Sequence, residues 1–451
     1  MVLLRRSSCR RNLRRSQWRI TATRSWPGLS RRIRIGRNIR SVQLPLRSRR
    51  NDLIQHFLAY GHADQDFFRG QTDLYDGLTI PGTIAAFYQQ GTGGFVLAQH
   101  KPYFIDPRTP VFQIAPGQLR KSHWALASIH GATVRKKVET GSLDPTSLTP
   151  EQLREMTVAV LQFQETFAQK STQKIDKYLK MIGQESAGGN FNAPAWLVPP
   201  YFYDPSVRGA NYGVSLDIAR MAQAENGGER VHPIACVDKR ALSTAGSDVN
   251  NLIDDYAPFS QTILFFSVFE EANASEPQLQ GFWNLVRGLS GRGRPPFMLF
   301  GGYFSILAHY VGLAGFSHGI GYGESRNALS PVSGPPGKRF YIPALRRFFT
   351  VAEAEYLIAA DRKERGLFQC VCGPCEAARA AGRGALDRRT REDIFHHFLR
   401  VRHDEVMSIQ IRKLTDLVAD LRDVHAASVD LALALRLERD LVLGVQHVQE
   451  Q

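Results

Sequence analysis

Short apolar segments that are typical of β-strands alternate with longer helix-like stretches along most of this chain. These segments are rich in β-branched or aromatic side chains, and most lie next to Gly, Pro or an acidic residue. They are residues 93–99, 103–106, 195–202, 231–238, 262–271, 295–302 and 315–324. Repetition of strand and then helix predicts parallel strands joined by right-handed crossovers. We therefore expect an α/β fold.

The clearest helix signal spans residues 150–182. Thr149 is a suitable N-cap, Pro150 fits the first helical position, and Gln152 completes a capping box. Strands and helices in this order form either a (β/α)8 barrel or an open doubly wound sheet. A dinucleotide-binding open sheet would carry G-x-G-x-x-G after a strand, whereas the glycine-rich residues 288–296 precede one. The sequence therefore favours a (β/α)8 TIM-like barrel, with candidate catalytic groups at the carboxyl ends of its strands.

Excess positive charge is confined to the first 50 residues. The net charge of the chain is +15, and residues 1–50 hold 16 arginines, no lysine and no acidic residue. The remainder has 41 of the 57 basic residues against all 42 acidic ones, so it is nearly neutral. Like charges with little apolar surface do not fold alone, which predicts a disordered arm. Three explanations stay open: a transit peptide, a phosphate-binding arm, or translated sequence upstream of a mis-assigned start.

Three of the five cysteines, Cys370, Cys372 and Cys375, lie within six positions. The C-x-C-x2-C spacing lets three thiolates converge on one ion, and zinc binds four such ligands as a tetrahedron. The fourth ligand would come from a downstream helical stretch that carries His396, His397 and His403. With four protein ligands the zinc would be structural. The alternative, a cluster of three unliganded thiols, would be prone to oxidation.

The cysteines also indicate the compartment. They are few, odd in number and clustered, unlike a secreted disulfide framework, so we expect a reducing, cytoplasmic location. No apolar segment reaches the about 20 residues of a membrane-spanning helix, so we expect no membrane partner. We divide the chain into an arm (1–50), a barrel (51–365), a zinc-binding segment (366–412) and a C-terminal helical region (413–451). The amphipathic pattern after Ile409 fits a helix pair or, alternatively, a homo- or hetero-dimer interface.

The cysteine motif, followed by a distant His in "HHFL", resembles the zinc site of the tRNA-guanine transglycosylase family. This family includes queuine and archaeosine enzymes and a branch that inserts 7-deazaguanines into DNA. Four upstream segments, "PYFIDPRTPVFQ", "VHPIACVD", "ILFFSVFEE" and "PPFMLFGG", are similar to family strands and occur in the same order. The resemblance covers residues 55–412. It implies a barrel with structural zinc held by His397 and the three cysteines.

The resemblance also implies roles for residues at strand ends. Asp106 would be the general acid/base, and Asp238 would read the edge of the incoming base. Glu270, Gly301 and Gly302 would line the substrate site. Each also has an ordinary explanation: Asp106 precedes a proline as in a turn, Asp238 precedes a lysine and an arginine as in a surface ion pair, and Glu270 suits an exposed loop.

The sequence departs from the family pattern in the spacing of 21 residues between Cys375 and His397, in Pro-Arg-Thr after Asp106, and at Ser317. The nucleophilic Asp of the family follows a Phe, and here Ser317 follows that Phe. Formation of a covalent glycosyl intermediate needs a carboxylate, which serine does not supply. Glu324 in "GYGESR" is then the candidate nucleophile, and Arg326 would hold a phosphate or that carboxylate.

These residues predict a transglycosylase that exchanges guanine for a 7-deazaguanine base in tRNA or DNA. Such an enzyme would turn the target nucleotide out of its stack before reaction. Two alternatives stay open. One is a non-catalytic zinc-containing relative that binds nucleic acid or a catalytic partner, and the other is a glycosidase that acts on a small nucleoside.

Overall fold

The computed structural model describes residues 53–426, except for most of 170–192 and residues 244–245, 322, 332–336, 365 and 367. The predicted arm (1–50), the end of the predicted helix 150–182 and most of the predicted C-terminal helical region lie outside the described residues. None of the described helices is both long and apolar enough to cross a membrane.

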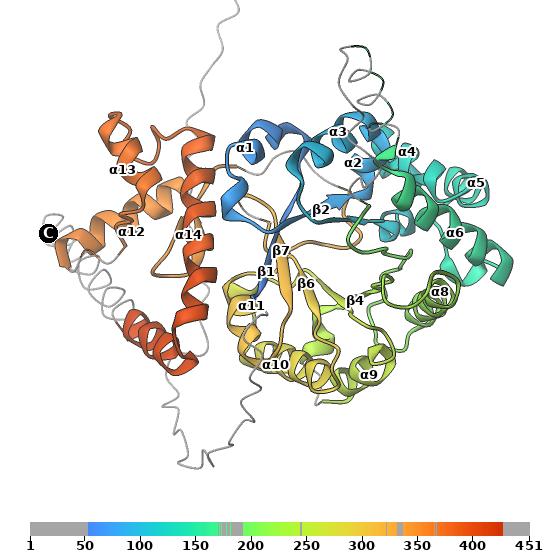
Figure 1. Ribbon diagram of the computed structural model, residues 1–451. Coiled ribbons are helices and arrows are strands. Elements are labelled where there is room, and N and C mark those ends of the chain that lie inside the picture. Colours follow the sequence, from blue (N-terminus) through green and yellow to red (C-terminus); the bar gives the residue numbers. More distant parts are fainter. Residues whose placement is uncertain are drawn as a thin grey trace, which may run out of the picture. The chain divides into compact units, whose positions relative to one another are not determined.

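Seven parallel strands form a curled central sheet in the order β3-β2-β1-β7-β6-β5-β4. They are β1 (Gln55–Ala59), β2 (Gly77–Pro81), β3 (Tyr103–Asp106), β4 (Ile234–Asp238), β5 (Ile263–Ser267), β6 (Phe297–Leu299) and β7 (Gly315–His318). Strand β1 is an interior strand of the sheet, because it is hydrogen-bonded to both β2 and β7. The predicted α/β class with parallel strands is confirmed, and Figure 1 shows helices surrounding the strands.

An irregular segment, residues 195–204, connects the two edge strands β3 and β4. Trp196 forms an isolated parallel bridge with Phe104 of β3, and Asp204 forms one with Val237 of β4. The segment contains two consecutive prolines, which have no amide hydrogen to donate and therefore interrupt a regular ladder. The predicted strand 195–202 is therefore an extended segment with isolated bridges.

Ten helices with described bounds follow the strands and cover the sheet. They are α1 (Gln65–Arg69), α2 (Gly82–Phe87), α3 (Gln89–Gln99), α4 (Lys121–Ile129), α5 (Ala132–Thr140), α6 (Pro150–Thr166), α8 (Ala210–Asn226), α9 (Ser247–Tyr256), α10 (Glu276–Gly291) and α11 (Tyr303–Ala308). The predicted capping box of α6 is present, with reciprocal hydrogen bonds between Thr149 and Gln152. The predicted strand 93–99 is wrong, because these residues belong to α3.

Apolar side chains fill both faces of the sheet. On the inner face, aromatic rings dominate, and Phe57 stacks on Trp196 with ring centroids 5.4 Å apart. On the outer face, strand residues such as Leu58 and Phe316 are buried under the surrounding helices. A sheet buried on both faces has room for polar chemistry mainly at its ends.

The C-terminal part forms a second cluster of elements. It contains an antiparallel hairpin of β8 (Arg339–Ile342) and β9 (Arg347–Thr350), followed by α12 (Val351–Glu364), α13 (Gly373–Ala380) and α14 (Arg391–Ile411). Phe340 of β8 and Ile358 of α12 share one apolar core with Cys375. The hairpin and α12 therefore belong with the cysteine segment, whereas the sequence placed residues up to 365 in the barrel.

Candidate metal centre and strand-end site

Cys370, Cys372, Cys375 and His397 lie together, and their ligand atoms are within 4.8 Å of one another. Nδ1 of His397 is 3.2 Å from Sγ of Cys375 and 3.3 Å from Sγ of Cys372. Helix α13 begins inside the motif, and this turn brings the third cysteine beside the first two. A tetrahedral ion with bonds of about 2.0–2.3 Å would hold such atoms somewhat under 4 Å apart. The four predicted ligands therefore form a cluster that could hold a metal ion.

Groups outside the cluster contact its two buried members, Cys375 and His397, and hold their side chains in place. Nε2 of His397 lies 2.7 Å from the carbonyl oxygen of Tyr341. Because this oxygen only accepts, Nε2 carries the hydrogen and Nδ1 presents its lone pair to the sulfur atoms. The Phe340 ring stacks on the imidazole at 4.3 Å, and Nη1 of Arg389 donates to Sγ of Cys375 at 3.0 Å. The buried guanidinium would offset part of the negative charge of three thiolates.

Hydrogen bonds within the cluster shift the pKa values of two thiols in opposite directions, raising that of Cys372 and lowering that of Cys375. Hydrogen bonds from Cys370 and Cys372, together with His397, hold the pKa of the Cys375 thiol far below its usual range. Only the thiolate is a metal ligand. Cys375 is therefore ready to bind a cation without first losing a proton to a base.

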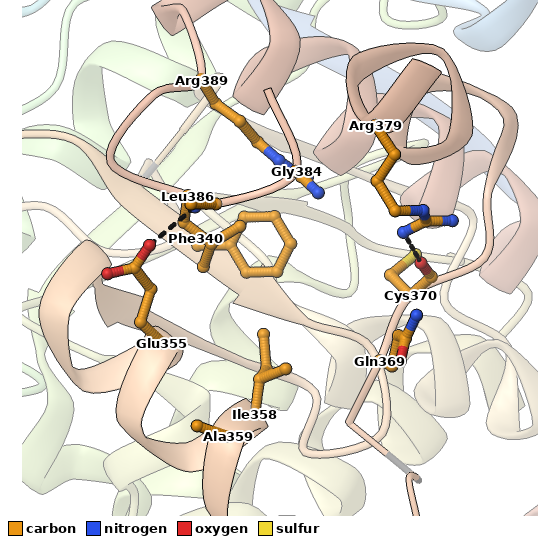
Figure 2. A pocket seen from close by; sticks show the side chains of 11 residues that line it. Phe340, Glu355, Ile358, Ala359, Gln369, Cys370, Arg379, Gly384, Leu386 and Arg389 are labelled. Atoms are coloured by element: carbon orange, nitrogen blue, oxygen red, sulfur yellow. Dashed lines mark hydrogen bonds between the residues drawn. The ribbon is translucent and has the colours of Figure 1, made fainter. Parts of the chain in front are cut away.

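A pocket of about 210 Å³ lies behind the cluster. Figure 2 shows its residues: Phe340 and Ile358 contribute apolar walls, and Arg379 lies across the pocket from Glu355. The Phe340 ring that lines this pocket is the ring that stacks on His397. The pocket is thus next to the metal cluster.

Asp106 ends β3 and is buried at the carboxyl edge of the sheet. Its Oδ1 accepts hydrogen bonds from the Tyr201 hydroxyl at 2.7 Å and from the backbone N–H of Arg108 at 3.0 Å. Nε of Arg108 is 3.8 Å from Oδ2 of the same carboxylate. Three contacts from two elements therefore fix the orientation of the Asp106 carboxylate.

Arg326 belongs to the same group of residues. It lies in the loop after β7, and its guanidinium is 5.7 Å from the centroid of the Phe300 ring. Burial, followed by the charge of Arg108, lowers the pKa of Arg326 to about 9, although Asp106 and Tyr201 act in the opposite direction. Of the predicted site residues, Asp106 is thus one whose charge acts on Arg326.

Asp238 and Glu270 lie at the ends of the next two strands. Asp238 ends β4 and accepts hydrogen bonds from the Tyr203 hydroxyl at 3.1 Å and from Nε of Arg240 at 2.8 Å. Burial raises the pKa of Asp238, but the hydrogen bonds from Arg240 and Tyr203 outweigh it and lower the pKa overall. This ion pair with Arg240 matches the ordinary explanation offered from the sequence. Glu270 is half-buried and directly precedes the short 3-10 helix η7 (Glu271–Asn273).

Glu324 lies in a second group of charged residues, which joins the barrel to α14. Its carboxylate forms an ion pair with the fully buried Arg402, which also lies 3.1 Å from Glu405. Burial raises the pKa of Glu324 to about 8, against Arg402, and the nearby Glu271 and Glu405 raise it further. Arg346 pairs with Glu405 from the other side, but Arg402 and Arg346 together are fewer than the carboxyl groups of Glu324, Glu405, Glu271 and Glu270, so Glu324 can retain a proton near neutral pH.

The predicted pair of glycines also lies in this second group. A Cβ atom on Gly302 would stand 2.9 Å from Oε2 of Glu271 and 3.2 Å from Oε2 of Glu324. Glu271 in turn accepts hydrogen bonds from Oγ and N of Ser305 at 2.5 and 3.1 Å, in the first turn of α11. A Cβ atom on Gly301 would meet Ser305 at 2.5 Å. The two glycines thus allow buried carboxylates and a helix start to approach the backbone.

Three of the six non-glycine residues that have a positive φ in the described part of the chain follow strands of the central sheet. Arg108 after β3, Val268 after β5 and Phe300 after β6 have φ angles of 53°, 60° and 60°. This left-handed region is especially unfavourable for the β-branched Val268. Strained non-glycine residues persist where the surrounding structure holds them, and they are concentrated at functional sites. We therefore take this edge of the sheet as the candidate active face.

Removal of Arg402 should destabilise the protein strongly. In Arg402→Met, Glu324 would stay buried without its cation, whereas Glu405 would keep its ion pair with Arg346, and the loss of one partner of a buried ion pair costs about 3–5 kcal/mol. The free energy of unfolding, measured by denaturant titration, should fall by that amount. Arg400→Met is the control, because Arg400 forms an exposed pair with Asp404 on the same helix, worth less than about 1 kcal/mol. Equal losses in the two variants would contradict a buried network.

Comparison with known proteins does not assign this chain to a family. No protein-family model matches the chain, and no curated protein sequence matches it significantly. Functional inference therefore depends on the residues and contacts described above.

Sequence analysis did not identify several residues of these sites. Tyr201 lies in a segment that pairs with β3 only through an isolated bridge, so nothing local connects it to Asp106. Arg402 is on an amphipathic helix, where arginine ordinarily faces solvent. The spacing of Arg108 two residues after Asp106 was a usable signal, because an Asp side chain often accepts the N–H two residues later.

Proposed function

We propose that the protein is a transglycosylase that exchanges guanine for a 7-deazaguanine base in tRNA or DNA. The observation that carries this proposal is the buried Asp106 carboxylate at the end of a parallel strand, oriented by Tyr201 and Arg108. Substitution at a glycosidic carbon requires a positioned carboxylate, which either attacks the sugar or transfers a proton. Asp106 has the burial and the fixed orientation that either role needs.

We further propose that the sheet belongs to a (β/α)8-type barrel. Two observations support closure: β1 pairs with β7, and residues 195–204 bridge β3 and β4. If this segment is counted as the eighth strand, the strands follow one another in chain order around the barrel. The strand-end residues would then surround a single mouth.

We propose zinc as the metal of the cysteine cluster. Three thiolates and one imidazole form a donor set that zinc prefers. Cys370, Cys372, Cys375 and His397 would fill all four tetrahedral positions, so the ion would be structural. It would tie α13 to α14 without contact with the substrate.

The contacts of Glu324 favour a structural role for this residue. Attack on a sugar would require its carboxylate to leave Arg402, a fully buried cation that would then lose a partner. We therefore assign the general acid/base to Asp106: the incoming base would displace guanine directly at the sugar carbon, while Asp106 gives a proton to the departing guanine and takes one from the incoming base. Tyr201 and the backbone of Arg108 would hold the Asp106 carboxylate in place.

A second candidate function is a non-catalytic relative that binds nucleic acid. It is favoured by Ser317, which stands at the nucleophile position of the family, is fully buried, and has an Oγ without a hydrogen-bond partner in the described part of the chain. The ion pair of Glu324 with Arg402 favours the same reading, because it occupies the other candidate nucleophile.

Exchange of labelled guanine or a 7-deazaguanine into tRNA and DNA tests these proposals. Asp106→Asn should slow exchange by about 10²–10⁴-fold, as expected for loss of a general acid/base. The matched control is Asp217→Asn, at an exposed position of α8, which should leave the rate unchanged. Loss of exchange in a well-folded Glu324→Gln chain would instead assign the nucleophile to Glu324. Absence of exchange in the unmodified chain with both nucleic acids would favour the non-catalytic function.

A further inference from the structure

The pocket of about 210 Å³ beside the metal cluster is lined by two arginines, Arg379 and Arg389. Nη1 of Arg379 donates to the carbonyl oxygen of Cys370 at 2.9 Å, and Nη1 of Arg389 donates to Sγ of Cys375 at 3.0 Å. One hydrogen bond thus fixes each guanidinium group. Because a guanidinium group has five N–H donors, each arginine keeps further donors for a ligand in the pocket.

Neither arginine has a carboxylate partner in the described part of the chain, where other arginines near the pocket, such as Arg383, do form ion pairs. Arg389 is only 4% exposed, and its Nε has no hydrogen-bond partner among the described residues. A buried N–H group without an acceptor costs free energy. A ligand carboxylate would supply acceptors that this guanidinium group lacks.

Glu355 of α12 also lines the pocket, and Figure 2 shows it across from Arg379. Its Oε1 accepts the backbone N–H groups of Leu386 at 2.7 Å and of Asp387 at 3.1 Å. Its Oε2 accepts no hydrogen bond from the described residues, and the side chain is half-buried. One oxygen of this carboxylate is therefore available to a cationic group of a ligand.

Apolar side chains separate the two charged ends of the pocket. In Figure 2, the buried Phe340 and Ile358 lie between Glu355 and Arg379. The Phe340 ring is held in place, because it stacks on His397 and lies 5.3 Å from Cζ of Arg389. Pockets for drug-sized ligands have about 300–1,000 Å³, so this smaller pocket suits a ligand with a single ring or a short chain.

We propose that this pocket binds a small zwitterion with an apolar middle. Its carboxylate would lie at Arg379 and Arg389, its ammonium group at Glu355, and its middle against Phe340 and Ile358. Charge-assisted hydrogen bonds at both ends would fix its orientation. The proposal does not depend on the transglycosylase function, because the strand-end site contributes none of these residues.

Binding of para-aminomethylbenzoate to the full chain, measured by isothermal titration calorimetry, tests the zwitterion site. This probe has a carboxylate and an ammonium group at opposite ends of one ring. Benzoate lacks the ammonium group, and benzylamine lacks the carboxylate. Each should therefore bind at least about tenfold more weakly than the zwitterion, which is the effect of losing one charged hydrogen bond.

Two variants distinguish the ends of the pocket. Glu355→Gln keeps an oxygen for the two backbone N–H groups but removes the charge, so it should weaken binding of the zwitterion about tenfold and leave benzoate unchanged. Arg379→Gln should weaken binding of both probes by a similar factor. The controls are Glu353→Gln on the same helix and Arg388→Gln, both at exposed positions outside the pocket lining, and they should change neither affinity.

Three results would each overturn the proposal. In the first, the zwitterion does not bind at concentrations up to about 1 mM, or benzoate and benzylamine bind as tightly as it does. In the second, Glu355→Gln weakens benzoate as much as the zwitterion, which would indicate general damage to the pocket. In the third, the exposed controls lose as much affinity as the pocket variants. If Arg379→Gln releases the metal, Glu355→Gln and the three probes still decide, because Glu355 contacts no residue of the cysteine cluster through its hydrogen bonds.

Discussion

Cys375→Ser should purify without metal and should lose most of the stability of its C-terminal elements, whereas the parent chain should carry about one zinc. Structural zinc contributes directly to folding, by about 10–16 kcal/mol in isolated zinc-finger peptides. Here the ion would connect α13 to α14 through Cys375 and His397, both fully buried. Metal analysis and thermal denaturation of the two chains would measure the effect.

Neighbouring histidines on α14 provide the control for this prediction. His397→Ala should release the metal, because its Nδ1 faces two sulfur atoms. His396→Ala should retain it, because His396 lies against Phe67 with ring centroids 4.8 Å apart. A parent chain that is free of metal and as stable as Cys375→Ser would remove the zinc assignment.

Acid should destabilise this protein as its buried histidines take up protons. Burial lowers the pKa of His130 and His232 to about 4 and that of His318 to about 3. In the unfolded chain these groups titrate near pH 6.5, so the unfolded state binds more protons below that pH. The free energy of unfolding therefore falls as pH falls, by about 1.4 kcal/mol per pH unit for each histidine. At pH 4.5 the three together would remove about 8 kcal/mol.

Glu324 changes the pH dependence of the free energy of unfolding in the opposite direction. Its pKa is raised to about 8, so its contribution to stability is fully present below the unfolded value near 4.5 and is lost as pH rises through 8. Three histidines outweigh this one carboxyl group below pH 6.5, and we expect maximum stability near that pH. Urea titrations between pH 7 and pH 5 would measure the slope. His130→Gln should flatten it and the partly exposed His396→Gln should not, whereas a stability independent of pH would show that these histidines are not buried in neutral form.

Local patterns account for the parts of the fold that sequence analysis predicted. The capping box of α6 and the cysteine spacing each operate within a few residues, and both are present in the structure. Strand β1 was not predicted, although it is an interior strand of the sheet, because its five residues include the polar Gln55 and His56. The prediction of a strand at residues 93–99 was wrong because a short buried apolar run is compatible with a strand or a helix. In the structure these residues belong to α3.

Only part of the candidate site could be predicted from the sequence, because sequence patterns report local structure. Asp106 could be selected because it ends a predicted strand, and strand ends meet at one edge of a parallel sheet. The partner of Glu324 could not be predicted from the sequence, because Arg402 is 78 residues further along the chain and the pairing depends on how α14 packs against the barrel.

Helix α14 carries both His397 and Arg402, which are about 7.5 Å apart along a helix axis. One residue belongs to the metal cluster and the other to the buried ion pair with Glu324. We therefore expect the metal ligands and the buried ion pair to be retained together or lost together in evolution. In a lineage that loses a cysteine of the cluster, the metal no longer holds α14 in place. The buried arginine on this helix would then lower the stability of the fold. We expect such lineages to replace the Glu324 and Arg402 pair with apolar residues, and lineages that retain the four metal ligands to retain the pair.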